Sequence, residues 1–304
     1  MSTYLTILGF NSAIPTINSS PTAQLLEMEE RMFLIDCGEG TQVQLRKAKA
    51  RFSKLNHIFI SHLHGDHCFG LPGLIASFRL LGRTTPLHVY GPKGIKKMLE
   101  TIFTITETHR GFEIVYHELD KKVSEKIYED KRVEVFTIPL DHRIYCNGYL
   151  FKEKPKERHL NMAAISEFSE IEICDYQNLR NGKDFVCEDG TTIPNAELTT
   201  DPKVSVSYAF CSDTRYKEDI IPLIKNVDVL YHESTFLHEL KEMADYTGHT
   251  TAQEAATIAK KAEVGKLIMG HFSNRYDDLT VMTTEAREIF PNSYLPKALE
   301  CVKL

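Results

Sequence analysis

The sequence predicts an α/β fold in which β-sheets are packed between layers of helices. Strand-like segments follow one another closely over the first half of the chain, and strands alternate with helices over the last third. Sheets with apolar faces need cover, and helices that alternate with strands supply it. Residues 152–202 interrupt this rhythm with charged, polar, proline and glycine residues. We therefore expect one domain over residues 1–304 with an arm inserted at 152–202.

Apolar runs and turn signals place the expected elements in order along the chain. Strands are expected over Thr3–Phe10, Ala23–Met28, Arg31–Asp36, His57–Ile60, Leu87–Tyr90, Glu113–His117, Arg132–Pro139, Gly148–Phe151, Ser205–Cys211, Asp228–His232 and Lys266–Gly270. Helices are expected over Thr41–Ala50, Leu71–Leu81, Gly94–Phe103 and Thr251–Ala262. Thr250 or Thr251 is the expected N-cap of the last helix, and Glu254 stands three residues after Thr251, as in a capping box.

Composition and charge restrict the class of protein. The hydrophobic fraction of 42% and the charged fraction of 26% are typical of a globular domain. A net charge of −6 argues against tight non-specific binding to nucleic acid, although it leaves room for a local basic face. Seven cysteines without a Cys-x-x-Cys pair indicate a reducing cytoplasm rather than a disulfide framework. The sequence predicts neither a secretory signal nor a membrane-spanning segment.

The densest chemical signal is the run Ser61–His67, which reads Ser-His-Leu-His-Gly-Asp-His. His62 and His64 are two residues apart, so on extended backbone they point to the same side. Asp66 and His67 follow a glycine, where the chain can turn and aim two more ligands nearby. Imidazole and carboxylate groups suit zinc and related metals. The pattern favours two neighbouring metal ions, and the alternative is a surface cluster of histidines.

Three further strands end in residues that could complete such a centre. His142, Asp213 and His271 each follow an apolar strand, and functional groups of α/β proteins gather at the carboxyl ends of strands. Taken singly, each is more often a cap or turn residue. Together with the histidine run they favour a two-metal centre, in which a carboxylate such as Asp213 can bridge two cations, as an imidazole cannot.

These motifs resemble those of the ribonuclease Z family in the metallo-β-lactamase superfamily. The resemblance includes Asp36–Gln42, Ser61–His67, Leu140–Arg143, Cys211–Arg215, His232–Phe236, Gly248–Thr251 and His271–Tyr276. The last two motifs separate ribonuclease Z from lactamases and glyoxalases. The resemblance implies a metallo-β-lactamase αββα sandwich with an inserted flexible arm that grips tRNA.

The resemblance also implies the ligands, the cofactor and the partners. It places one zinc ion on His62, His64 and His142. It places a second on Asp66, His67 and His271, with Asp213 bridging the two. Zinc, two ions per chain, is the expected cofactor, and manganese is the alternative metal. Precursor tRNA is the expected partner, and a homodimer without membrane attachment is the expected assembly.

Three residues are candidates for the chemistry itself. Asp66 can orient or deprotonate the attacking water besides binding metal. His249 is the candidate donor of a proton to the leaving 3′-oxygen, and Glu233 is the carboxylate that could orient His249. The alternatives are that His249 is only a helix-start residue and that Glu233 is a structural acid. Asp36 and Glu39 are expected to pack behind the metal loop rather than to catalyse.

Four residues are candidates for contacts with the substrate. Arg275 could bind the scissile phosphate in a bidentate manner, although an ordinary surface arginine fits nearly as well. Ser273 belongs to the same motif. Lys152 and Lys154 stand where the arm is expected to leave the domain.

Two regions depart from the family pattern. The loop Pro15–Ser20 reads Pro-Thr-Ile-Asn-Ser-Ser, where the family has Pro-x-Lys-x-Arg-Asn, so the sequence gives no ground for expecting either presence or absence of discrimination against CCA-ended tRNA. Residues 152–200 carry six basic and ten acidic side chains, and only Lys152–Arg158 is net basic. The basic run from Arg46 to Lys54 is a second candidate RNA surface, or a solvated helix face.

The leading hypothesis is a zinc-dependent endoribonuclease that removes the 3′ trailer from precursor tRNA by two-metal phosphodiester hydrolysis. The alternative is a metallo-phosphodiesterase that acts on small phosphodiesters on the same scaffold. A third class is a non-catalytic RNA-binding or interaction protein. The complete ligand set argues against that class, because a binding module has no use for a two-metal centre.

Overall fold

The computed structural model describes residues 3–17, 19–108 and 111–304. The chain divides into two compact units, one formed by Met1–Lys152 with Val206–Leu304 and the other by Glu153–Ser205. Among the described residues, the larger unit contains two seven-stranded sheets.

The first sheet has the strand order β18-β1-β2-β3-β4-β5-β6. Neighbours from β18 to β3 pair antiparallel, and neighbours from β3 to β6 pair parallel. Both faces of β3 to β5 carry buried apolar residues, and His57 and His88 are half-buried exceptions on β4 and β5. The strands are β1 (Tyr4–Gly9), β2 (Ala23–Met28), β3 (Arg31–Ile35), β4 (Leu55–Phe59), β5 (Leu87–Pro92), β6 (Ile114–Leu119) and β18 (Cys301–Lys303).

The second sheet has the strand order β17-β16-β15-β14-β9-β8-β7. The strands from β17 to β14 pair parallel, and β9 pairs antiparallel with β14. The strands are β7 (Lys126–Glu129), β8 (Val133–Pro139), β9 (Asn147–Glu153), β14 (Ser207–Cys211), β15 (Val229–Glu233), β16 (Lys266–Gly270) and β17 (Ser293–Tyr294).

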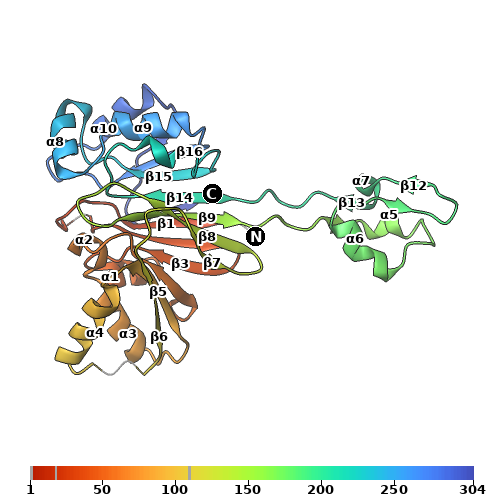
Figure 1. The fold of residues 1–304 in the computed structure, drawn as a ribbon, viewed down its shortest axis with the longest axis horizontal. Helices are drawn as coiled ribbons and strands as arrows, with labels where there is room; N and C mark the ends of the chain where they lie inside the picture. The colour runs from red at the N-terminus through yellow and green to blue at the C-terminus, as the bar shows by residue number, and fades with distance from the viewer. Residues whose placement is uncertain (1–2, 18, 109–110) are drawn as a thin grey trace. The chain divides into compact units, whose positions relative to one another are not determined.

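The two sheets face each other, and helices cover their outer faces (Figure 1). Aromatic rings from both sheets meet between them, with Phe33 5.4 Å from Phe151 and Phe59 5.3 Å from Tyr149 between ring centroids. Helices near the first sheet are α1 (Thr41–Lys47), α2 (Gly65–Cys68), α3 (Leu71–Leu80) and α4 (Ile95–Ile105), with the 3₁₀ turn η1 (Phe52–Lys54). Those near the second are α8 (Lys241–Thr247), α9 (Ala252–Lys261) and α10 (Thr280–Arg287), with η3 (Glu218–Ile220) and η4 (His238–Leu240).

The start of α9 is fixed by the expected capping box. The Thr251 hydroxyl accepts a hydrogen bond from the Glu254 amide at 3.3 Å, and the Glu254 carboxylate accepts one from the Thr251 amide at 3.1 Å. Thr251 rather than Thr250 is therefore the N-cap, because its side chain satisfies an otherwise unpaired amide of the first turn. This cap sets the position of His249, two residues earlier.

The smaller unit has its own secondary structure and apolar core. Its elements are β10 (His159–Leu160), α5 (Met162–Ile165), η2 (Ile173–Asp175), α6 (Tyr176–Arg180), β11 (Phe185–Val186), β12 (Thr192–Ile193), α7 (Asn195–Leu198) and β13 (Thr199–Thr200). Ile165, Leu179, Ile193 and Leu198 are buried together in this core. The unit occupies Glu153–Ser205, where the sequence predicts an arm over residues 152–202.

The predicted α/β layering is confirmed, and each expected strand and helix is present; Ala23–Met28 and Lys266–Gly270 have the expected ends, and the other elements differ at one or both ends. The sequence analysis missed the short elements α2, α8, α10, β7, β17 and β18. Strands β7, β17 and β18 have two to four residues at sheet edges, where a strand leaves little periodic signal. No helix within the described residues combines the length and the apolarity needed to cross a bilayer.

Candidate metal centre

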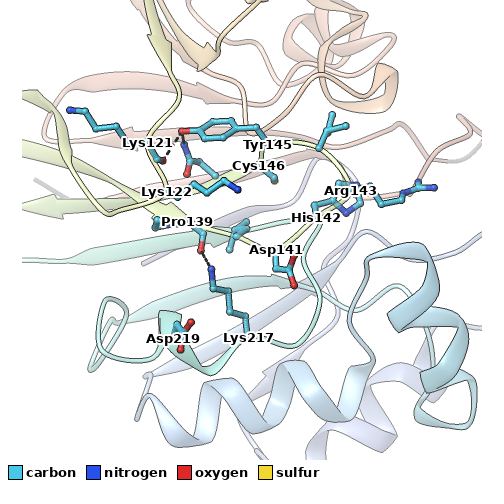
Figure 2. Close-up of a pocket in the computed structure, with 13 residues that line it drawn as sticks. Lys121, Lys122, Pro139, Asp141, His142, Arg143, Tyr145, Cys146, Lys217 and Asp219 are labelled. Atoms are coloured by element: carbon cyan, nitrogen blue, oxygen red, sulfur yellow. Dashed lines mark hydrogen bonds between the residues drawn. The ribbon is translucent and has the colours of Figure 1, made fainter.

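The candidate ligands lie at the carboxyl ends of four strands. His62, His64, Asp66 and His67 follow β4 and run into α2. His142 follows β8, which ends at Pro139, and Figure 2 labels both residues. Asp213 follows β14, and His271 follows β16 directly. Four strands from two sheets therefore deliver seven ligand groups to one place.

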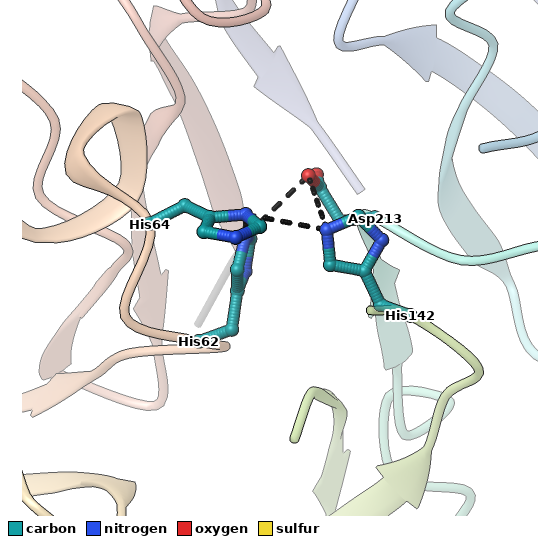
Figure 3. A group of neighbouring side chains, drawn as sticks. All are labelled: His62, His64, His142 and Asp213. Carbon is teal, nitrogen blue, oxygen red and sulfur yellow. Dashed lines mark hydrogen bonds and ion pairs between the residues drawn. The ribbon is translucent and has the colours of Figure 1, made fainter. Parts of the chain in front are cut away.

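The first group contains His62, His64, His142 and Asp213 (Figure 3). His64 Nδ1 lies 3.0 Å from His62 Nε2 and 3.2 Å from His142 Nε2. Asp213 Oδ2 lies 3.4 Å from His62 Nε2 and 3.7 Å from His142 Nε2. Three imidazole nitrogens and one carboxylate oxygen thus face one small volume.

The second group contains Asp66, His67 and His271. Their facing atoms are close, with His67 Nε2 3.3 Å from His271 Nε2 and Asp66 Oδ2 3.4 Å from His271 Nε2. Asp213 reaches this group with its other oxygen, because Oδ1 lies 3.2 Å from both His67 Nε2 and His271 Nε2. Each carboxylate oxygen of Asp213 therefore faces a different group, as a bridging ligand would.

Hydrogen bonds behind the ligands fix which ring nitrogen carries a proton. His67 Nδ1–H donates to Asp36 Oδ2 at 2.7 Å, and His142 Nδ1–H donates to the Gly248 carbonyl at 2.7 Å. Both rings therefore turn an unprotonated Nε2 towards the cluster, which is the arrangement of metal-binding histidines. Gly248 has φ of 83°, and a Cβ there would lie 2.9 Å from His142 Nδ1, so this position requires glycine.

The ligand geometry fits a metal better than it fits a network of hydrogen bonds. His64 Nδ1 lies within 3.2 Å of two other ring nitrogens, yet one N–H can be directed at only one of them. Convergent lone pairs without protons between them repel unless a cation lies among them. Three histidines with one or two carboxylates are also a ligand set that zinc prefers.

The backbone at the site is unusual at three polar residues. Asp36, Asp213 and His271 have positive φ values of 57°, 61° and 58°. The left-handed region is unfavourable for residues with a Cβ, and non-glycine residues adopt it mainly where tertiary structure imposes it. Here it turns each side chain at the end of its strand towards the cluster.

His249 and Glu233 form a buried pair beside the two groups. His249 Nδ1–H donates to Glu233 Oε1 at 2.9 Å, and Glu233 is 0% exposed. The Glu233 carboxylate also accepts from the amides of Thr214 and Thr250 and from the Thr235 hydroxyl. This carboxylate is thus fully held in place, and it leaves His249 Nε2 free for the cavity that His249 lines.

The charges of this site shift the pKa values of both catalytic candidates. Burial lowers the pKa of His249, but the charge and hydrogen bond of Glu233 outweigh burial and raise it to about 9. Burial raises the pKa of Asp66, but other interactions, its hydrogen bond with His271 first among them, outweigh burial and lower the pKa. At neutral pH His249 therefore carries a proton that it could donate, and Asp66 is ionised.

His249 also lies close enough to Asp213 and His271 to form a third group of possible ligands. A protonated imidazole cannot bind a metal, because both ring nitrogens carry hydrogen. The bond to Glu233 and the raised pKa of His249 therefore favour a proton donor over a ligand.

The candidate substrate contacts are less concentrated. Ser273 lines a cavity of about 320 Å³ that contains His64, Asp66, His249 and His271. Arg275 is exposed and does not line this cavity. Its guanidinium lies over the Phe236 ring, 5.1 Å from the ring centroid. Its Nε donates to Ser273 Oγ at 3.1 Å.

The two candidate lysines have separate surroundings. Lys152 is on β9 with Nζ 5.7 Å from the centroid of the Phe136 ring. Lys154 belongs to the smaller unit. The structure therefore does not bring Lys152 into the lining of the metal cavity.

Sequence reasoning missed three contributors to this site. Asp36 was expected only to pack, yet it accepts hydrogen bonds from His67 and from the amide of Ser61. The Thr235 hydroxyl lies 3.0 Å from His271 Nδ1 and bonds Glu233 as well. Arg143 lines the cavity, and its place directly after His142 was the available signal.

Comparison with known proteins gives full-length matches. The chain is 45% identical to Ribonuclease Z of Bacteroides thetaiotaomicron over 300 residues, which cover 99% of this chain and 95% of that protein. The crystal structure of human tRNase Z, short form, matches with a TM-score of 0.71 at 25% identity and covers 98% of each chain.

Two further matches concern the fold. The metallo-β-lactamase fold protein YhfI from Bacillus subtilis has a TM-score of 0.69 at 18% identity, with 100% of both chains covered. A family model described as anti-Pycsar protein Apyc1 matches residues 3–139. The predicted metallo-β-lactamase sandwich is therefore confirmed.

Proposed function

Since this chain belongs to the ribonuclease Z family, we propose that it is a metal-dependent endoribonuclease that removes the 3′ trailer from precursor tRNA. The product would be a tRNA with a free 3′-hydroxyl. The observation that carries this proposal is the pair of ligand groups that share Asp213, set beside a buried proton donor at His249. Both features suit phosphodiester hydrolysis, because negative charge develops on the attacking and on the leaving oxygen.

We propose zinc as the native metal, with two ions per chain and manganese as the alternative. His62, His64 and His142 would hold one ion, and Asp66, His67 and His271 would hold the other, with Asp213 between them. Two such ions supply positive charge to the phosphodiester and make water acidic enough to ionise near neutral pH. The predominance of imidazole ligands favours zinc over magnesium or calcium.

The chain's own residues would direct the protons of the reaction. The ionised Asp66 accepts a hydrogen bond from the Ala13 amide at 2.8 Å, which fixes its carboxylate as the orienting group for water. His249 Nε2–H would donate its proton to the leaving 3′-oxygen. Glu233 keeps the His249 ring in position through Nδ1 and keeps it protonated.

We propose that the smaller unit, with Lys152 and Lys154, binds tRNA away from the cleaved bond. Lys156 pairs with Glu153 at 2.6 Å, and Arg158 pairs with Asp201. These pairs reduce the positive charge that the sequence suggests for Lys152–Arg158. Deleting residues 155–199 should weaken precursor binding while the larger unit still hydrolyses a small diester, and unchanged binding would refute this role.

We also propose a cytoplasmic homodimer. None of the seven cysteines, all of which lie within the described residues, forms a disulfide, which agrees with a reducing compartment. Light scattering at several protein concentrations measures the assembly, and a monomer at all of them would refute the dimer.

The decisive experiment uses the full chain, purified without chelator, and a precursor tRNA labelled at its 5′ end. Cleavage should give one product that ends at the tRNA 3′ terminus with a hydroxyl group. A matched assay with bis(p-nitrophenyl) phosphate tests the alternative of a small-phosphodiester enzyme. Hydrolysis of the small diester without any cut in precursor tRNA would refute the proposed substrate.

A further inference from the structure

A second cavity adjoins the metal centre and has no part in the chemistry described above. It has a volume of about 510 Å³ and lies between the loop that joins β8 to β9, the turn after β6 and the start of η3 (Figure 2). Its lining includes Lys122, His142, Arg143, Lys217 and Asp219.

This cavity and the metal cavity share a lining residue. Arg143 lines both, and His142 lines the second cavity while its Nε2 faces the first ligand group. An extended polymer with one phosphate at the metal ligands would therefore pass Arg143 before it reached the second cavity. A small phosphodiester would fill the first cavity alone.

The second cavity presents unneutralised positive charge. Lys122 and Lys217 enter it from opposite sides, and Arg143 extends at one end (Figure 2). Within the part of the chain that the structure describes, neither Lys122 nor Arg143 has an acidic partner, and Lys217 Nζ donates only to the Pro139 carbonyl at 3.2 Å. This cluster stands out in a chain whose net charge is −6.

The remaining charges of the lining do not cancel these cations. Lys121 pairs with Glu125, and Figure 2 shows its side chain directed away from Lys122. Asp141 lies 3.4 Å from Arg215, which compensates part of its charge. Asp219 is the remaining carboxylate of the lining.

The walls of the cavity are held together by hydrogen bonds. The Tyr145 hydroxyl donates to the Lys121 carbonyl at 3.0 Å, which joins the loop after β8 to the turn after β6. The Asp141 amide donates to Thr214 Oγ1 at 3.1 Å, which joins the same loop to the segment after β14. The cations are therefore presented by a preorganised frame, which lowers the entropic cost of binding.

We propose that Lys122 and Lys217 form a flanking-phosphate site that binds a backbone phosphate of the RNA chain next to the cleaved bond, with Arg143 on the path between this site and the metal cavity. This inference rests on the proposed function, because the RNA must first enter the metal cavity. Ammonium groups bind phosphate as compact charges, and a guanidinium can bind it through two N–H groups. Such contacts position a polynucleotide and supply affinity without reading its sequence.

The test compares two double variants with equal loss of charge. Lys122→Gln/Lys217→Gln removes two cations from the flanking-phosphate site. Lys131→Gln/Lys260→Gln is the matched control, because Lys131 precedes β8 and Lys260 is near the end of α9, so each lies at the end of its element away from the metal centre. All four lysines are at least partly exposed, so both variants should fold.

The flanking-phosphate variant should raise KM for precursor tRNA roughly tenfold with kcat within about twofold, and the slope of log Kd against log salt should fall by about 0.7 for each lost contact. The control variant should match the wild type. A shift of equal size in both variants would show a general charge effect and would overturn the site.

Neutral methylphosphonate groups placed singly along the precursor then locate the bound phosphate. At one position beside the cleaved bond, the substitution should weaken binding by the wild type but not by Lys122→Gln/Lys217→Gln. If no position loses its effect in the variant, the flanking-phosphate site is wrong. Failure of the wild type to cut any precursor tRNA would instead refute the proposed function.

Discussion

Two histidine clusters depend on strand β4, and they differ in almost everything except residue type. The metal centre begins at His62, beyond the end of the strand. The second cluster, here called the histidine ladder, consists of His57 on β4, His88 on β5 and His117 on β6. Its rings stack at centroid distances of 5.0 and 5.4 Å.

The contacts between ring nitrogens are similar in the two clusters, but their surroundings are not. His88 Nδ1 lies 3.1 Å from His117 Nε2, as close as the nitrogens of the metal centre. One N–H···N hydrogen bond satisfies that pair, whereas His64 faces two nitrogens at once. Among the described residues, no carboxylate lies with the ladder histidines in a group that could hold a metal ion.

The comparison teaches that histidine number is a poor guide to metal binding. What distinguishes the metal centre is a carboxylate that faces two groups and a set of acceptors, such as Asp36 and the Gly248 carbonyl, that fix the ring tautomers. The ladder packs instead against aromatic side chains, with His57 4.8 Å from Tyr128 between ring centroids. Four predictions test whether this distinction is the right one.

The largest effect is expected from Asp213→Ala. Without its charge, two bound cations would repel each other at close range, so the variant should lose metal and more than about 10³-fold in turnover, equal to roughly 4 kcal/mol. Elemental analysis should give close to two metal equivalents for the wild type and less than one for the variant.

The ladder and an exposed acid provide the controls for that experiment. Both His88→Ala and Asp277→Ala should keep the wild-type metal content, because neither residue contributes to a ligand group. If His88→Ala lost one metal equivalent, the ladder would itself be a metal site, and the distinction between the two histidine clusters would be wrong.

The next largest effect is expected from His249→Ala. If His249 is the proposed proton donor, its removal should slow cleavage by roughly 10²–10⁴-fold while both metals and tRNA affinity are retained. Turnover, metal content and Kd should be measured on the same preparation. Loss of a metal equivalent would assign His249 to the third ligand group, and normal turnover would leave it a structural residue.

A smaller effect is expected from Asp36→Asn. Asparagine keeps the shape but removes the charge that holds His67 Nδ1–H, so metal affinity should fall by roughly 10–100-fold. Competition with a chelator measures this affinity. The control is Glu39→Gln, at an exposed position close by in the chain. Equal metal affinities for Asp36→Asn and the wild type would show that Asp36 contributes only to packing.

The grouping of the candidate metal ligands could be predicted from the sequence, because these residues come from one local run and from strand ends. His62 to His67 are adjacent in the chain, and β8, β14 and β16 each end beside a candidate ligand. Strand ends can be located from apolar periodicity, and the topology of an α/β fold brings them together.

The rest could not be predicted because it depends on which distant groups meet. The bond from His67 to Asp36 spans 31 positions, and the cavity shared by Lys122, Arg143 and Lys217 joins three separate loops. The ladder needs the register of three strands, and no local pattern around His57, His88 or His117 specifies it.

The smallest effect is expected from His57→Phe, and it concerns stability against acid. Burial, with the charges of His88 and His117, lowers the pKa of His57 to about 4, from about 6.5 in an unfolded chain. His57 Nδ1 is also buried without a hydrogen-bond partner among the described residues. Between pH 6.5 and pH 4, His57 therefore binds a proton in the unfolded chain but stays neutral in the folded chain.

The sign follows from this difference in bound protons. The stability that neutral His57 permits is fully present above pH 6.5 and is lost as the pH falls from 6.5 towards 4, with about 2 kcal/mol lost at pH 5. Phenylalanine fits among Phe33, Tyr90 and Tyr128 and does not titrate. The free energy of unfolding of His57→Phe, measured in urea, should therefore fall about 2 kcal/mol less between pH 7 and pH 5 than that of the wild type.

The control for this experiment is His159→Gln, at an exposed position of the smaller unit, which should keep the wild-type pH dependence. Equal acid sensitivity in His57→Phe and the wild type would show that the ladder is not a distinct neutral cluster. Other groups, the metal-centre histidines first among them, would then bind the protons that are taken up on unfolding.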